Sequence, residues 1–157
     1  MGLLCRFQLI LQRSSLLTIY KTFIRSQSDF AVVICNQAYN SSFHEKFEPL
    51  QYNACLAITG AIKRISPEKL YQELALESLK SRRWFRKLCH FHKILNEKSP
   101  SYLFDLIPNL NRVCETRHSN NIPAIHTRHN YFKNSFFPST ISEWNNLDCK
   151  IRNSGSV

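Results

Sequence analysis

The sequence predicts a mainly α-helical fold: a small helical bundle with a polar irregular arm and a short C-terminal helix. Three observations support this. Apolar residues recur at helical spacing in several separate segments. The 157 residues include only three glycines, too few for the many positive-φ turns of a hairpin-rich β fold. The apolar content of 43% is enough for a modest core in one domain.

Residues 1–40 predict a poorly defined N-terminal helical segment. Between residues 14 and 25, apolar side chains such as Leu16, Tyr20 and Phe23 recur at helical spacing. Residues 30–35 form a short apolar run that periodicity cannot assign to strand or helix. Residues 2–11 are interrupted by Arg6 and Gln8, so we expect neither a secretory leader nor a membrane span there.

Residues 41–108 predict the helical core. Its first helix is indicated by an apolar stripe whose spacing is 4, 3, 4 and 4 residues: Phe43, Phe47, Leu50, Ala54 and Ile58. Pro49 should kink this helix or make it begin later, and Gly60 should end it. Ser66 followed by Pro67 and Glu68 is a typical start of a second, short helix.

The clearest predicted helix begins at Leu79 and ends before Pro100. One narrow face is expected to pack, and it carries Trp84, Leu88, Phe91 and Leu95. The opposite face is basic and carries Arg82, Arg86, His90 and Lys93, with Arg83 and Lys87 beside them. Pro100 should then start a further short helix that stops at Pro108.

Residues 109–157 predict a polar arm plus a short C-terminal helix that is truncated. Residues 109–130 are rich in Asn, Arg, His and Thr, which is typical of an irregular connection. Pro138 should open the last helix, with Ile141, Trp144 and Leu147 on one side.

Charge gives the main indication of a partner. Lys and Arg total 21 against 11 acidic residues, a formal charge of +10, which favours polyanionic partners, RNA or DNA first. The candidate nucleic-acid-binding residues are Arg82, Arg83, Arg86, Lys87 and Lys93, whose side chains suit phosphate contacts. The alternative is that they form an ordinary solvated helix face. A second basic set is interleaved with Tyr131 and Phe132, and comprises Arg112, Arg117, His118, His126, Arg128, His129 and Lys133.

The sequence offers little for catalysis. Its three aspartates, Asp29, Asp105 and Asp148, lie far apart, so no local carboxylate pair could hold two metal ions. Three isolated glycines build no phosphate loop. Zinc ligation by Cys89, His92, Cys114 and His118 stays open, although their spacing favours structural cysteines.

We therefore expect no metal, no cofactor, no small-molecule substrate and no membrane partner, and the sequence leaves the oligomeric state undetermined. The six cysteines are scattered and no leader precedes them, which favours reduced thiols and an intracellular location, nuclear or cytoplasmic.

Eight short strings along the chain carry a family resemblance. They are residues 20–25 (YKTFIR), 51–61 (QYNACLAITGA), 79–85 (LKSRRWF), 91–95 (FHKIL), 99–108 (SPSYLFDLIP), 132–141 (FKNSFFPSTI), 143–145 (EWN) and 151–154 (IRNS). In this order they resemble the region after the polymerase core of non-LTR (jockey-like) retrotransposon reverse transcriptases. The resemblance extends over nearly everything from about Leu16 to Ser154.

This resemblance implies a thumb-like helical segment beside the palm of an RNA-directed DNA polymerase, following the template-primer backbone. The catalytic aspartates of the family lie upstream of the matching region, so the resemblance implies a truncated, degenerate fragment that is not an enzyme by itself. Ser26, where the family usually has proline, and Pro49, inside a helical string, depart from its pattern. The alternative is a non-enzymatic helical protein-interaction module.

Overall fold

The computed structural model describes residues 2–29, 41–108 and 121–152, without the side chains of residues 3, 28 and 41–46. This part of the chain is mainly helical and contains no strand, which confirms the predicted fold class. It divides into two compact units, and each is described here by itself. Unit 1 comprises residues 2–29 and 41–84, and unit 2 comprises residues 85–108 and 121–152. The segment 41–108, expected as one core, is thus shared between the units.

Unit 1 begins with four consecutive helical elements. α1 (Gly2–Phe7) was not specifically predicted, and its Leu4 is buried. α2 (Arg13–Ile19), the π-helical turn η1 (Tyr20–Ile24) and α3 (Arg25–Asp29) follow one another without a break. Helix is therefore confirmed for residues 14–25, but its middle turn is widened to the π form, which the spacing did not indicate.

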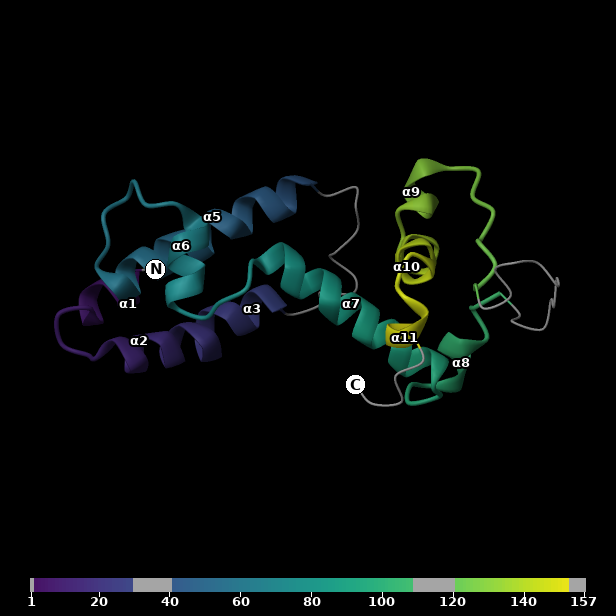
Figure 1. Cartoon of the computed structure of the whole chain (residues 1–157), viewed down its shortest axis with the longest axis horizontal. Helices are drawn as coiled ribbons and strands as arrows, with labels where there is room; N and C mark the ends of the chain where they lie inside the picture. The colour runs from purple at the N-terminus through teal and green to yellow at the C-terminus, as the bar shows by residue number, and fades with distance from the viewer. Residues whose placement is uncertain (1, 30–40, 109–120, 153–157) are drawn as a thin grey trace. The chain divides into compact units, whose positions relative to one another are not determined.

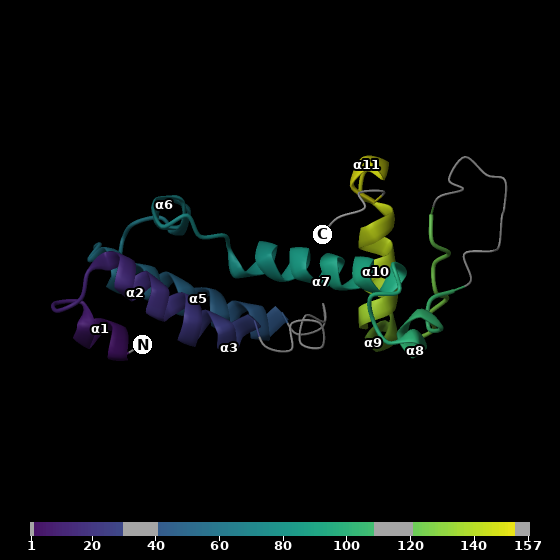
Figure 2. The same ribbon diagram turned by 90° about the horizontal axis from the view of Figure 1, so that it is seen from below.

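The long helix α5 (Ser41–Thr59) lies antiparallel to α2 and α3, as Figures 1 and 2 show. Pro49 is accommodated inside it, so the expectation of a later helix start is wrong. Gly60 follows the helix with φ of 70°, a left-handed conformation that confirms it as the stop.

The stripe predicted for α5 is only partly correct. Ala54 and Ile58 are buried, but Leu50 is exposed. The neighbouring Gln51 is buried instead, because the oxygen and the nitrogen of its side-chain amide are both hydrogen-bonded. Its Oε1 accepts a hydrogen bond from Tyr20 Oη at 2.9 Å, and its Nε2 donates to the Glu77 carbonyl at 2.8 Å.

α6 (Pro67–Glu73) completes the core of unit 1. Ser66 is its N-cap and Pro67 its first residue, as predicted. Leu70, Tyr71 and Leu74 face the same cluster as Leu16 and Tyr20, so α6 packs on the helices already described.

Helix α7 (Leu79–Leu95) starts in unit 1 and supplies unit 2 from Phe85 onward. Unit 2 also contains α8 (Ser101–Phe104), α9 (Asn130–Lys133), α10 (Phe136–Asn145) and α11 (Cys149–Arg152). Helix α10 begins two residues before Pro138, and α11 was not predicted. The core of unit 2 consists of Leu88, Phe91, Ile94, Ile107, Ile122, Ile141 and Trp144.

An extended stretch that begins at Asn121 is fixed to α10 by one side chain. Asn145 Oδ1 accepts a hydrogen bond from the Ile122 amide at 3.0 Å, and its Nδ2 donates to the Ile122 carbonyl at 2.9 Å. The Asn145 amide therefore satisfies both backbone groups of Ile122 and lets its side chain enter the core. The first part of the predicted polar arm, residues 109–120, lies outside the described residues.

Candidate nucleic-acid interface

The structure separates the five predicted cations of α7 into three classes of exposure. Arg83 and Lys87 are buried, with 2% and 3% of their surface exposed. Arg86 and Lys93 are exposed, and Arg82 is intermediate. The expectation that all five share one accessible face is therefore wrong, and Arg83 and Lys87 are removed from the candidate surface. The role of the other three in binding stays a prediction.

Arg83 is buried against an aromatic ring of α5. Its guanidinium carbon lies 5.1 Å from the centre of the Phe47 ring, within the range of a cation–π interaction. Arginine is the cation best suited to such a place because its planar guanidinium is weakly hydrated. The side chain therefore stabilises unit 1.

Lys87 is buried against α10. Its Nζ donates a hydrogen bond to Glu143 Oε1 at 2.9 Å, and the two groups form an ion pair. The Lys87 side chain is 4% exposed and that of Glu143 is 36% exposed, although the second carboxylate oxygen of Glu143, Oε2, is buried and accepts no hydrogen bond from the described residues. The pair joins residues 56 positions apart, which periodicity within one helix cannot indicate.

Arg82 is held by α3. Its Nε donates to Asp29 Oδ2 at 3.0 Å and to Oδ1 at 3.3 Å, in a partly buried ion pair. Asp29 thus compensates a cation of the predicted surface and takes no part in a carboxylate cluster.

The buried side of α7 is wider than the predicted one. Leu88 and Phe91 are buried, as predicted, and Leu95 is partly buried against the same core. Leu79, Arg83, Lys87 and Ile94 are buried as well. At 100° per residue these four are centred roughly 100° from the predicted face, on the side toward the basic residues. Trp84 is 43% exposed, so the prediction that it packs in the core is wrong.

Arg86 and Lys93 form the accessible basic part of α7 within unit 2. They are seven residues apart, so they lie on the same side of the helix, about 10.5 Å apart along its axis. His90 lies between them, half-buried, with its ring 5.8 Å from that of Phe136 in an edge-on arrangement. Burial lowers the pKa of His90, and the nearby Lys93 ammonium lowers it further.

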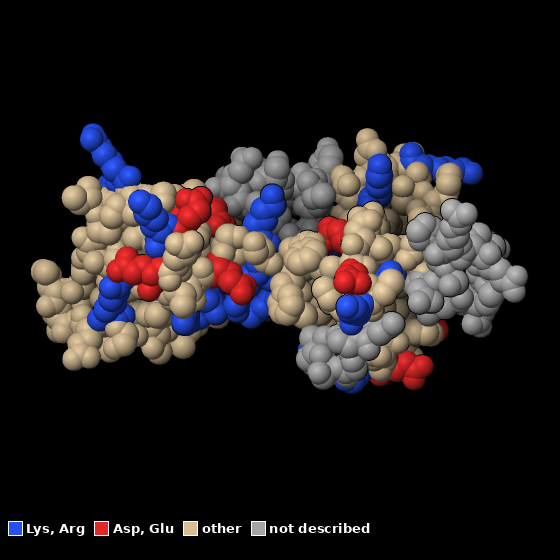
Figure 3. Space-filling view, viewed as in Figure 1, with Lys and Arg blue, Asp and Glu red and all other residues tan. Residues whose placement is uncertain are grey.

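The second basic set is exposed wherever the structure describes it. His126, Arg128, His129 and Lys133 are all accessible, whereas Arg112, Arg117 and His118 lie outside the described residues. Lys and Arg are interspersed with Asp and Glu on the face of unit 1 drawn at the left of Figure 3, and acidic side chains also lie among basic ones on unit 2 at the right.

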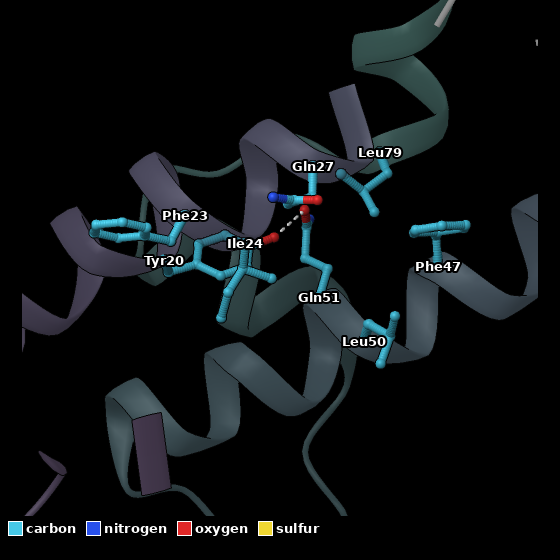
Figure 4. A pocket seen from close by; sticks show the side chains of 8 residues that line it. All are labelled: Tyr20, Phe23, Ile24, Gln27, Phe47, Leu50, Gln51 and Leu79. Atoms are coloured by element: carbon cyan, nitrogen blue, oxygen red, sulfur yellow. Dashed lines mark hydrogen bonds between the residues drawn. The ribbon is translucent and has the colours of Figure 1, made fainter. Parts of the chain in front are cut away.

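Unit 1 also contains an apolar pocket of about 230 Å³ that the sequence did not indicate. Three of its lining residues come from the π turn η1, and the hydrogen bond from Tyr20 to Gln51 lies within it (Figure 4). Phe23 and Leu50 are exposed to solvent. The full lining is Tyr20, Phe23, Ile24, Gln27, Phe47, Leu50, Gln51 and Leu79.

The proposed zinc ligands are only partly described. His92 is buried, and its Nε2 lies 3.0 Å from Asn96 Nδ2, while Cys89 is half-buried. Cys114 and His118 lie outside the described residues. Within the described part of the chain, no three His, Cys, Asp or Glu residues are grouped so that they could hold a metal ion.

No helix in the described ranges is both long enough and apolar enough to cross a bilayer. Comparisons with protein-family models, with curated proteins and with solved structures give no match to this chain.

Proposed function

We propose that this chain binds the backbone of RNA or DNA without sequence preference, through exposed cations. The observation that carries the proposal is the charge: a formal +10, with Arg86 and Lys93 exposed on one side of α7. Accessible cations of this kind release counterions from the phosphates they contact, which is the main source of nonspecific affinity.

The resemblance to the post-polymerase region of non-LTR reverse transcriptases supports the same proposal. In that view the chain is a degenerate fragment of an RNA-directed DNA polymerase. It supplies a helical surface for the template-primer and none of the catalytic aspartates, and it does not extend a primer by itself.

The proposal is tested by fluorescence anisotropy of a labelled single-stranded oligonucleotide at increasing salt. We expect the logarithm of the association constant to fall linearly with the logarithm of the salt concentration. Lys93→Met should make this negative slope shallower by about 0.7, the value for one lost phosphate contact on a single strand. Lys87→Met is the matched control, because it removes a lysine from the same helix that is buried and paired.

Two results would contradict the proposal. One is an affinity that does not depend on salt. The other is an equal loss of affinity in Lys87→Met and Lys93→Met, since the buried ammonium cannot reach a phosphate. Charge reversal of Arg82, Arg86 and Lys93 together should weaken retention on a nucleic-acid column.

The second candidate function is a non-enzymatic protein-interaction module, and the apolar pocket of unit 1 favours it. A partner helix would insert one bulky apolar side chain between the exposed Phe23 and Leu50. In that case charge reversal on α7 leaves retention of nucleic acid unchanged, whereas Phe23→Ser abolishes partner binding.

A further inference from the structure

A pair of aromatic rings is stacked on the surface of unit 2, immediately before and within α9. The rings of His129 and Tyr131 have centroids 5.4 Å apart and planes inclined by 12°. Tyr131 is 69% exposed and His129 is exposed. The neighbouring Phe132 is also exposed, and neither Tyr131 nor Phe132 belongs to the core cluster of unit 2. These rings therefore present apolar faces to water outside the core of the unit.

The turn that carries the rings is held in place by its backbone. The Lys133 amide donates to the His129 carbonyl at 3.0 Å, and the Asn134 amide donates to the Asn130 carbonyl at 3.1 Å. Ser135 adds two bonds to the Phe132 carbonyl, from its amide at 3.0 Å and from its hydroxyl at 2.7 Å. Helix α10 follows at once and is anchored in the core by Ile141 and Trp144. A ligand would thus meet rings that are already ordered, which reduces the entropy lost on binding.

The charge around the rings selects the ligand. Arg128 and Lys133 are exposed on either side of the stacked pair in the sequence. The sequence has no Asp or Glu between Glu115 and Glu143, so no acidic residue within this span opposes them. Exposed aromatic faces between exposed cations fit a ligand that combines flat rings with negative charge. Unpaired nucleotides have both, and the bases of a duplex are already stacked on one another.

We propose that residues 128–133 form a stacking site for the bases of single-stranded RNA or DNA. A base continues the His129–Tyr131 stack, and Arg128 and Lys133 contact the flanking phosphates. The proposal rests on the proposed function and adds to it a preference for unpaired strands over duplex.

The test compares four labelled ligands in anisotropy titrations of the full chain: single-stranded DNA and RNA 20-mers, a duplex, and a 20-mer with abasic sugars. Wild-type protein should bind the single strands more tightly than the abasic strand. Tyr131→Ala should weaken single-strand binding by roughly 5- to 150-fold, the range for one lost base–aromatic stack. It should leave the abasic strand and the salt slope unchanged, because no charge is removed. Tyr131→Phe keeps the ring and should bind as wild type.

Tyr102→Ala is the matched control, since Tyr102 is a 64% exposed tyrosine of the same unit that lies outside the stack. Quenching of 2-aminopurine in the single strand should be lost in Tyr131→Ala alone. Equal affinity of wild type for the abasic and the normal strand, or equal losses in Tyr131→Ala and Tyr102→Ala, would overturn the stacking site and leave backbone binding standing. No binding of any of the four ligands would overturn both.

Discussion

The buried ion pair between Lys87 and Glu143 leads to a stability prediction with an asymmetric outcome. Glu143→Ala leaves the Lys87 ammonium, on a side chain only 4% exposed, without its carboxylate. Lys87→Met keeps the length and apolar stem of the side chain and removes the charge that needs a partner. Both variants delete the same ion pair, but the first leaves its charge on a side chain that is almost entirely buried, and the second on one that is partly exposed.

The magnitude follows from the two exposures. Removing one partner of a fully buried pair costs about 3–5 kcal/mol. Glu143 is 36% exposed, so water can enter where its side chain stood, and we expect Glu143→Ala to lower the free energy of unfolding by about 2–3 kcal/mol. In Lys87→Met the remaining Glu143 side chain is 36% exposed but its Oε2 is buried, so the loss should be smaller than in Glu143→Ala, at about 1 kcal/mol. The double variant should resemble Lys87→Met.

The assay is urea unfolding followed by tryptophan fluorescence. The chain has two tryptophans, and Trp84→Phe leaves Trp144, which is buried in the core of unit 2 where Glu143 and Lys87 lie. All variants are therefore compared in the Trp84→Phe background, so that the signal comes from unit 2 alone.

The reasoning would be refuted if Lys87→Met destabilised unit 2 as much as Glu143→Ala. It would also be refuted if the double variant lost the sum of the two effects, because that would mean that the side chains act independently.

Three further predictions concern single groups. Asp29→Asn removes the carboxylate that holds Arg82 and should lower the free energy of unfolding by about 2 kcal/mol in urea titrations. Its affinity for nucleic acid, measured by anisotropy, should not fall. A weaker complex would contradict backbone binding. Burial raises the pKa of Cys55 to about 12, so at pH 8 its thiol stays protonated and should react with a disulfide reagent only after unfolding, as mapped by mass spectrometry. Burial lowers the pKa of His90, and the Lys93 ammonium lowers it further. Lys93→Met should therefore raise the pKa of His90 in an NMR titration. An unchanged pKa would argue against an influence of Lys93 on His90. Because the unfolded chain binds this proton more readily, His90 should make the protein less stable as the pH falls below about 6.5.

Much of the fold could be predicted because its signals are local. Ser66 and Pro67 mark the start of α6, and Gly60 ends α5 in a left-handed conformation that glycine adopts readily. Such signals depend on a few neighbouring residues. Pro49 allowed two alternatives, a kink or a later start of the helix, because a proline inside a helix is unfavourable locally. Only the later start is wrong, since α5 begins at Ser41.

The candidate surface could be predicted only in part because charge does not report burial. A helical pattern assigns Arg83 and Lys87 to the solvent side, and that is correct only if neither finds a partner. Their partners, Phe47 on α5 and Glu143 on α10, come from distant parts of the sequence. From the sequence, the rings at His129 and Tyr131 are only aromatic side chains among basic residues, since their mutual orientation depends on the turn that carries them.

Net charge alone does not locate a binding surface on this chain. Unit 1 has eleven basic and six acidic residues and unit 2 has ten and five, so each carries a formal charge of +5. The arrangement differs. In unit 1, Arg13 lies 2.5 Å from Glu73, and on the face in Figure 3 acidic and basic side chains are mixed. In unit 2, Arg128 and Lys133 belong to a span, residues 116–142, without any acidic residue. A neighbouring carboxylate within the screening length of about 8 Å weakens the attraction of a cation for phosphate. Equal net charges should therefore give unequal affinities, and the contribution of unit 2 should be the larger.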